Sequence, residues 1–236
     1  MKKLFYLFSG LIVALCVASC GSDEPDPVRT HREPVDLGLS VKWAPMNIGA
    51  SSPEAYGALY GWADSAGNHQ TLDERITIAY QSGNIVKCDW HSPYFGGMSP
   101  LANISGTDYD IAAYTWGADW RVPTRAEMQE LIDKCTFTPE TTTGGVVCLR
   151  ATGPNGNSIL LPLAGIRETV SAESRGAYGY YWTADLLPKA SQSTYGYDSN
   201  VACAAWSATM SATTARPTMS PILRNLGLSI RPVTPK

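Results

Sequence analysis

The sequence has little charge and few histidines, and each shortage excludes a class of function. Charged residues make up 17% of the 236-residue chain, the formal net charge is −3, and three histidines are present. A nucleic-acid-binding surface requires clustered lysine and arginine, so nucleic acid is excluded as a partner. His31, His69 and His91 are far apart and no Cys-x-x-Cys motif accompanies them, so we predict no metal site.

The sequence also lacks the motifs that mark common catalytic centres. It contains neither a G-x-S-x-G nucleophile elbow nor a P-loop. A glycosidase needs two facing acids, and the pairs to consider are Asp108 with Asp110 and Asp64 with Asp73. Asp108 or Asp110 is equally suited to cap the helix that follows. We predict no catalytic residue, and no cofactor unless these acids bind Ca²⁺ beside loop carbonyls.

Long hydrophobic runs are absent apart from one near the N-terminus. Leu4–Val17 is apolar, follows Lys2 and Lys3, and ends in the small residues of V-A-S-C. A membrane-spanning helix needs about 20 apolar residues, so this run is too short, and its layout is that of a secretory signal peptide over residues 1–19. V-A-S-C resembles a bacterial lipobox, which implies cleavage before Cys20 and lipid attachment to its sulfur. An ordinary signal peptide is the alternative.

Residues 20–34 follow the predicted cleavage site and are rich in acidic residues and proline, with no apolar period. Such a composition predicts a disordered tether between lipid and domain. The S-D-E after Cys20 resembles the signal that exports Bacteroidetes lipoproteins to the outer face of the outer membrane. We therefore expect an outer-membrane lipoprotein exposed at the cell surface, and a periplasm-facing lipoprotein is the alternative.

Of the six cysteines, Cys16 leaves with the signal peptide and Cys20 carries the lipid. Four remain, and they allow three pairings in an oxidising compartment. Cys135 ends a predicted helix and Cys148 opens the next predicted strand, so a disulfide between these two is the first to test. Buried free thiols are equally compatible with the sequence.

The best-specified local structure is the stretch Trp120–Cys135. Thr124 and Glu127 have the spacing of a capping box, and apolar residues then recur on one helical face. Alternating apolar residues over Val35–Val41 predict a strand, and two apolar runs around Gly153–Asn157 predict a β-hairpin. The pattern of short helices and about seven strands predicts a single α+β domain over residues 35–236.

Several ordered motifs resemble a known family. They are V-D-L-G-L-S-V-K-W-A-P-M-N-I-G-A from Val35, Y-D-I-A-A-Y-T-W-G-A-D-W-R-V-P-T-R-A-E-M from Tyr109, T-G-P-N-G-N-S-I-L-L-P-L-A-G from Thr152, Y-G-Y-Y-W-T from Tyr178 and L-S-I-R-P-V from Leu228. Together they resemble the FISUMP (major paralogous domain) lipoproteins of Bacteroidetes. W-R-V-P-T-R-A-E-M is also distantly similar to the signature of the formylglycine-generating (sulfatase-modifying factor) family.

Both resemblances imply a C-type lectin-like fold, in which short helices and long irregular loops surround a small twisted, mostly antiparallel sheet. The formylglycine-generating enzymes bind copper through two cysteines shortly before their terminal strand. Here the corresponding stretch, Met210–Asn225, contains no cysteine and Cys203 stands alone. A single thiol cannot form a two-thiolate copper site, so we expect that oxidase activity to be absent. Met46 stands where many paralogues have cysteine, so their disulfide pattern does not transfer.

Aromatic residues in loop-like segments are the candidate ligand-binding residues, because exposed rings stack on sugars or anchor protein partners. They are Trp90, His91, Tyr94, Tyr195 and Tyr197. Filling an irregular core is the alternative role, which we assign to Trp43, Trp116, Trp120, Trp182 and Trp206. We predict a surface-anchored, non-catalytic lipoprotein that binds a glycan or a protein partner. The alternatives are a hydrolase acting on a polysaccharide or peptide, and an accessory subunit of a surface fibre.

Overall fold

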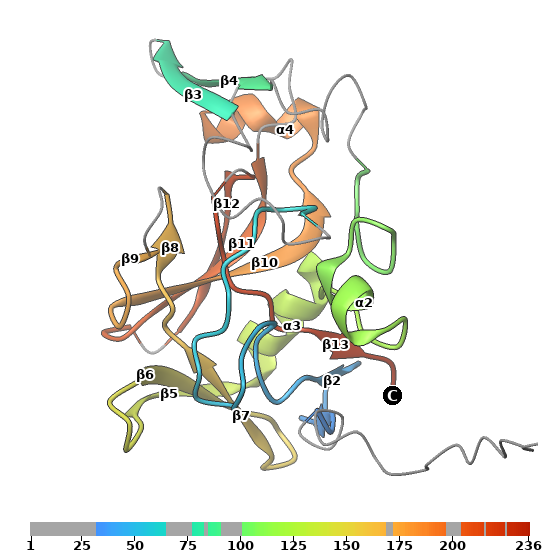
Figure 1. Cartoon of the computed structure of the whole chain (residues 1–236), viewed down its shortest axis with the longest axis vertical. Helices are drawn as coiled ribbons and strands as arrows, with labels where there is room; N and C mark the ends of the chain where they lie inside the picture. Colours follow the sequence, from blue (N-terminus) through green and yellow to red (C-terminus); the bar gives the residue numbers. More distant parts are fainter. Residues whose placement is uncertain are drawn as a thin grey trace, which may run out of the picture.

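The computed structural model describes residues 32–64, 101–168, 172–196, 204–214, 216–224 and 226–236, and the backbone of two strands at 77–82 and 85–90. These parts form short helices and small antiparallel sheets, so the α+β class is confirmed (Figure 1). In this part of the chain no helix is long and apolar enough to cross a membrane. The predictions for residues 1–31, including lipid attachment at Cys20, lie outside the described residues.

A three-stranded sheet forms the centre of the fold. Its order is β10 (Tyr178–Leu186), β11 (Ala204–Ser211) and β12 (Thr218–Leu223), all antiparallel. Neighbouring residues of β10 point to opposite faces, so Tyr181 enters one hydrophobic cluster and Trp182 enters another. The central sheet therefore separates two cores, and both residues are essentially inaccessible to solvent.

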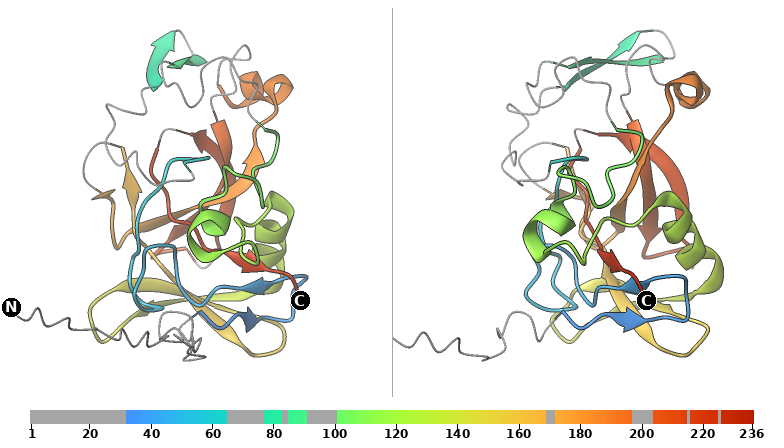
Figure 2. Two further views of the ribbon diagram at one scale, coloured as in Figure 1. Left: turned by 45° about the vertical axis from the view of Figure 1, so that its right-hand side comes forward. Right: turned by 90° about the vertical axis from the view of Figure 1, so that its right-hand side faces the viewer.

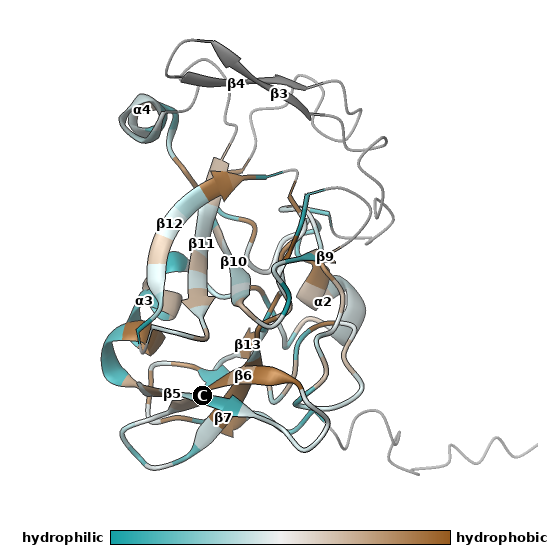
Figure 3. Ribbon diagram, turned by 90° about the vertical axis from the view of Figure 1, so that its left-hand side faces the viewer, coloured by the Kyte–Doolittle hydropathy of each residue, from teal (hydrophilic) through white to brown (hydrophobic). Residues whose placement is uncertain are grey.

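A second sheet lies below the first and confirms the predicted hairpin. It consists of β5 (Thr136–Thr141), β6 (Val147–Thr152) and β7 (Ser158–Pro162). Thr152 pairs with Ser158, and the turn between them is closed by the Gly153 amide donating to the Asn157 carbonyl at 2.8 Å. Figure 3 shows this sheet under the central sheet, with α3 (Arg125–Lys134) beside both.

A third small sheet brings the two ends of the domain together. β2 (Lys42–Trp43) pairs with β1 (Val35–Asp36) on one side and with β13 (Val233–Thr234) on the other. The strand predicted over Val35–Val41 is therefore wrong beyond Asp36. The Asp36 carboxylate accepts the Gly38 amide, and Gly38 has a φ of +77°, so the chain turns there. Leu37, Leu39 and Val41 of that run are nevertheless buried, in a loop.

The remaining elements are short. They are a hairpin of β3 (Thr77–Ser82) and β4 (Ile85–Trp90), the helix α2 (Ile111–Trp116), the pair β8 (Ile166–Arg167) and β9 (Ala172–Glu173), the single-turn helix α4 (Lys189–Gln192) and the 3₁₀ turn η2 (Ser193–Tyr195). Figure 2 shows α2 beside β13 and the C-terminus in both of its views. This corner of the molecule carries the site described below.

The capping box at the start of α3 is confirmed. The Thr124 hydroxyl accepts the Glu127 amide at 3.2 Å, and the Glu127 carboxylate accepts the Thr124 amide at 2.8 Å. Arg121 adds two bonds to the same carboxylate, at 2.5 and 2.8 Å. Burial raises the pKa of Glu127, but the hydrogen bonds from Arg121 and Thr124 outweigh it and leave the pKa below its usual value. The ionised carboxylate therefore anchors the helix to the preceding segment.

Replacing Thr124 with alanine is expected to lower the free energy of unfolding by about 1 kcal/mol, because the Glu127 amide loses its acceptor. Thr124→Ser keeps a hydroxyl and should stay within about 0.5 kcal/mol of the wild type. Urea unfolding of the three proteins makes the comparison. Equal stability of the alanine and serine variants would show that the hydroxyl contributes nothing.

The proposed disulfide between Cys135 and Cys148 is not formed, and both residues are free thiols. The β5–β6 register places Cys148 opposite Glu140, five residues beyond Cys135. At about 3.4 Å per residue this separates the two cysteines by roughly 17 Å, whereas a disulfide requires Cα atoms within about 7 Å. Burial raises the pKa of both thiols to about 11, so both are protonated at neutral pH.

A fully buried arginine joins three distant parts of the chain. Arg231 donates to the Asn47 side-chain oxygen at 2.9 Å, to the Ala44 carbonyl at 3.1 Å and to the Leu160 carbonyl at 2.6 Å. These acceptors are all neutral oxygens. Burial lowers the pKa of Arg231 to about 10, so the guanidinium stays charged at pH 7. The hydrogen bonds therefore compensate a buried charge.

Candidate functional site

Two adjoining hollows lie at the corner formed by α2, the C-terminal residues and the start of the domain. The larger has a volume of about 520 Å³ and the smaller about 320 Å³. Arg32 and Trp116 line both, so we treat the two as one depression and call it the Trp116 groove. The larger hollow is lined by Arg32, Glu33, Pro34, Trp116, Asp119, Trp120, Thr234 and Pro235. The smaller is lined by Arg32, Ile48, Gly49, Ala50, Ser51, Tyr60, Thr115 and Trp116.

Trp116 is the central residue of the groove, and its ring is held by local structure. It is the last residue of α2, and Gly117 ends the helix with a φ of +98°. The Trp120 ring meets the Trp116 ring edge-on, with centroids 5.4 Å apart and planes at 85°. Trp120 is buried while Trp116 is partly exposed. The buried ring therefore supports the exposed one.

A single buried carboxylate fixes α2 against the rest of the site. Asp110 caps the helix by accepting the amides of Ala112 and Ala113, at 2.8 and 3.2 Å. Its second oxygen accepts the amides of Gly106 and Val122, at 2.8 and 2.9 Å. Burial raises the pKa of Asp110, and the four amide donors oppose that shift. This carboxylate connects the helix that carries Trp116 to the segment that follows Trp120.

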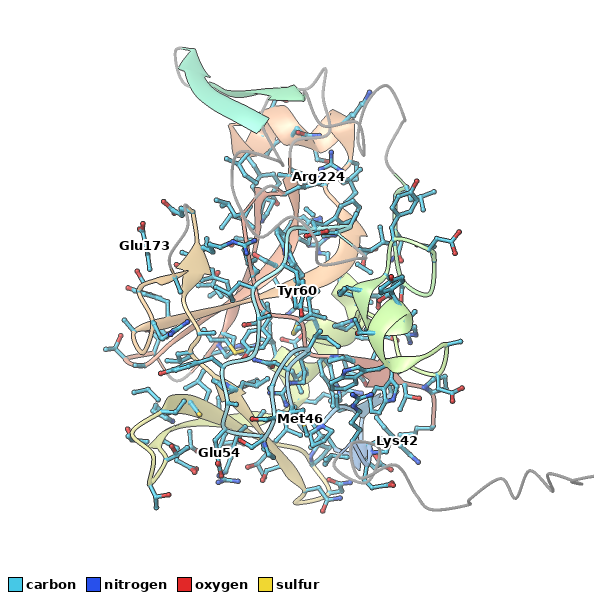
Figure 4. The ribbon with its side chains drawn as sticks, in the orientation of Figure 1. Lys42, Met46, Glu54, Tyr60, Glu173 and Arg224 are labelled. Carbon is cyan, nitrogen blue, oxygen red and sulfur yellow. The ribbon has the colours of Figure 1, made fainter. Side chains whose placement is uncertain are left out.

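The wall opposite Trp116 is formed by residues 48–51 and Tyr60. Backbone hydrogen bonds join Ile48 to Ile230 and Tyr60 to Leu228, so this wall is attached to the C-terminal segment. Gly49 has a φ of +76°, and a Cβ there would lie 3.0 Å from the Ala58 side chain. Figure 4 shows Tyr60 near the middle of the molecule. Only 8% of Tyr60 is exposed, and its burial raises the pKa of the phenol.

Besides the Arg32 guanidinium, the groove is lined by side chains that carry hydroxyls and carboxylates. Ser51, Thr115 and Thr234 provide hydroxyls, and the Thr115 hydroxyl donates to the Ile111 carbonyl at 2.6 Å. That leaves the Thr115 oxygen able to accept from a ligand. Glu33 and Asp119 line the larger hollow. An aromatic ring flanked by acceptors can stack on one face of a sugar and accept hydrogen bonds from its hydroxyls.

Arg32 occupies part of this groove. Its guanidinium carbon lies 4.6 Å from the centroid of the Trp116 ring, which is the geometry of a cation–π contact. Arg32 belongs to the segment that the sequence assigns to the tether, together with Glu33 and Pro34. The last residues before the domain thus line the groove.

Tyr195 is the one predicted ligand-binding residue whose side chain the structure describes, and it lies outside the groove. Tyr195 is 48% exposed and meets the Trp206 ring edge-on at 5.5 Å. The guanidinium carbon of Arg125 also lies over the Trp206 ring, 3.5 Å from the ring centroid. None of these three residues lines the Trp116 groove. The side chain of Trp90, and His91, Tyr94 and Tyr197 as a whole, lie outside the described residues.

Asp110, one of the acids considered for catalysis, has a structural role. Asp110 is a helix cap with both oxygens accepting backbone amides, which confirms the structural alternative. Asp108 is exposed, Asp64 is buried, and Asp73 lies outside the described residues. Within the described ranges no three His, Cys, Asp or Glu side chains form a cluster suited to a metal ion. The proposed Ca²⁺ site stays untested by this observation.

Sequence reasoning assigned Trp116 to the core together with four other tryptophans. Trp43, Trp120, Trp182 and Trp206 are buried as predicted, whereas Trp116 packs against one of the two cores and stays partly exposed. The sequence around Trp116 carries no signal for this exposure, because many of the residues that line the groove with it come from distant parts of the chain. Comparison with protein-family models, curated proteins and solved structures finds no match to this chain.

Proposed function

We propose that this chain is a non-catalytic binding protein anchored at the cell surface, and that its ligand is a glycan held in the Trp116 groove. The observation that carries the proposal is the partly exposed Trp116 ring in a groove with hydroxyl and carboxylate acceptors on its walls. A partly exposed aromatic ring can stack on one face of a sugar, so the Trp116 ring supplies the contact that the proposal requires. The proposed fold is C-type lectin-like, in line with the FISUMP resemblance and with terminal strands that share one sheet.

A glycan array tests this proposal. The chain from residue 21 onward, expressed without lipid, is expected to give hits whose signals fall at least tenfold in Trp116→Ala. Ser51→Trp should have the same effect, because Ser51 is exposed and a large ring there would fill the smaller hollow. Thermal unfolding of each variant verifies that the loss of binding is not a loss of folding.

Tyr195→Ala is the matched control, since it removes an exposed ring outside the groove. Hits that fall with Tyr195→Ala and persist with Trp116→Ala would move the site to the surface predicted from sequence. A blank array would contradict the glycan proposal. Release of new reducing ends from a bound oligosaccharide would contradict the non-catalytic part of it, because Glu33 and Asp119 share the larger hollow.

Anchoring is a separate proposal, supported by the apolar run that ends in V-A-S-C. Cys20→Ala is expected to abolish lipid labelling and to shift the protein from the membrane fraction to the soluble fraction, because the acylated sulfur is removed. Cys16→Ala, which changes the predicted signal peptide only, is the control and should leave labelling unchanged. Lipid labelling of the Cys20→Ala protein at the wild-type level would show that Cys20 is not the attachment site.

A further inference from the structure

We propose that the Trp116 groove selects glycans that carry a free amino group, and that Arg32 occupies the ammonium position until such a ligand displaces it. This inference rests on the proposed glycan-binding function and specifies its ligand class. Three observations support it: a guanidinium already stacked on Trp116, the acidic character of the remaining groove residues, and the place of Arg32 in the chain.

The first observation shows that the groove accommodates a positive charge against its central ring. The Arg32 guanidinium carbon lies 4.6 Å from the Trp116 centroid, within the range of about 6 Å in which an aromatic face attracts a cation. The edge-on contact with Trp120 sets the orientation of that face. A sugar ammonium could therefore meet the same indole face and the same attraction.

The second observation concerns charge. Among the described residues that line the two hollows, Arg32 is the only basic one, whereas Glu33 and Asp119 are acidic. When Arg32 leaves the groove, the only charged residues left in its lining are the acidic Glu33 and Asp119. A ligand with an ammonium group replaces the lost charge. A neutral N-acetylated sugar does not, and an acidic sugar is repelled by the two carboxylates.

The third observation concerns competition. Arg32 stands three residues before Val35, where β1 begins, so its guanidinium is held close to the ring at a high effective concentration. A ligand for the same position must displace Arg32. The apparent affinity is then the intrinsic affinity multiplied by the fraction of molecules in which the position is free. The end of the tether therefore raises the threshold for binding and favours ligands that match its charge.

Isothermal titration of the unlipidated chain from residue 21 tests the inference. The ligands are the β-1,4-linked glucosamine tetramer and its fully N-acetylated counterpart, at pH 6 and low salt. The amine tetramer is expected to bind at least tenfold more tightly than the acetylated one. Arg32→Ala should strengthen amine binding roughly fivefold by removing the competitor. Asp119→Asn should weaken it.

Arg175→Ala is the matched control for Arg32→Ala. Arg175 makes the same kind of contact, 4.7 Å from the Tyr56 ring centroid, but neither residue lines the groove. This variant should leave both affinities unchanged. A similar gain in Arg175→Ala would assign the effect to net charge and overturn the role of Arg32.

The remaining outcomes separate this inference from the proposed function. Equal or tighter binding of the acetylated tetramer, lost in Trp116→Ala, would overturn the charge selection and leave the groove as a glycan site. Unchanged amine affinity in Arg32→Ala would overturn the displacement. Failure of both tetramers together with Trp116-dependent hits for other sugars would overturn the amino-sugar class alone. Failure of both with a blank array would overturn the proposed function as well.

Discussion

Replacing Asp110 with alanine is expected to lower the free energy of unfolding by about 3 to 5 kcal/mol, because four backbone amides lose their acceptor at once. A buried donor left without a partner costs about 1 to 3 kcal/mol, and Asp110 has no solvent-exposed surface through which water could take its place. Asp110→Asn retains one oxygen but turns an amino group toward two of the donors. The free energy of unfolding of Asp110→Asn should therefore fall by roughly half as much as that of Asp110→Ala.

Urea unfolding of the Asp110 variants beside Asp108→Ala makes the comparison. Asp108 lies two residues earlier and is exposed, so its removal should change stability by less than about 0.5 kcal/mol. An Asp110→Ala protein as stable as Asp108→Ala would show that the carboxylate does not hold these amides. Because Asp110 joins α2 to the Val122 backbone, Asp110→Asn should also weaken glycan binding at Trp116.

Arg231→Met is expected to lower the free energy of unfolding by about 4 kcal/mol. Methionine fills much of the same volume with apolar atoms but leaves three neutral acceptors without their donor, namely the Asn47 side-chain oxygen and the Ala44 and Leu160 carbonyls. Arg231→Lys should lose nearly as much, since a compact ammonium cannot reach three acceptors placed in a fork. The loss is larger than that of a surface arginine because Arg231 is fully buried.

Arg216→Met provides the control for Arg231→Met. Arg216 is also paired, with the Asp133 carboxylate at 2.6 Å, but its side chain is 69% exposed. Ion pairs of this kind contribute about 0 to 1 kcal/mol. Chemical unfolding should therefore separate the two methionine variants by about 3 kcal/mol. Equal losses would contradict the account of Arg231 as the link between residues 44–47, β7 and the C-terminal segment.

The parts of the fold that sequence predicted are those encoded by neighbouring residues. The capping box of Thr124 and Glu127 is formed by groups three residues apart, and the turn at Gly153–Asn157 is specified by its own glycines and asparagines. In the same way Asp110 could be proposed as a cap from its position before Ile111. Local spacing was sufficient in each case, because both partners of the interaction lie within one short window.

The features that sequence missed depend on residues far apart in the chain. Arg231 meets Asn47 across 184 positions, and no local pattern indicates that pairing. Gly38 reverses the chain where alternation predicted a strand, because Asp36 bonds its amide. Trp116 was assigned to filling an irregular core, and it packs against one core while staying partly exposed. Arg32 and the C-terminal residues line the hollow beside it, and they reach the groove from opposite ends of the domain.

The measurement that tests the central claim most directly is an NMR titration of the chain carrying ¹⁵N-labelled tryptophan. The chain contains seven tryptophans, each with one indole N–H signal, and Trp116→Phe identifies the signal of Trp116. On addition of a glycan that scores on the array, the Trp116 signal is predicted to shift most. The Trp120 signal should follow it, and those of buried Trp43 and Trp182 should stay in place. Binding that leaves the Trp116 signal unmoved would contradict the claim that this groove is the glycan site.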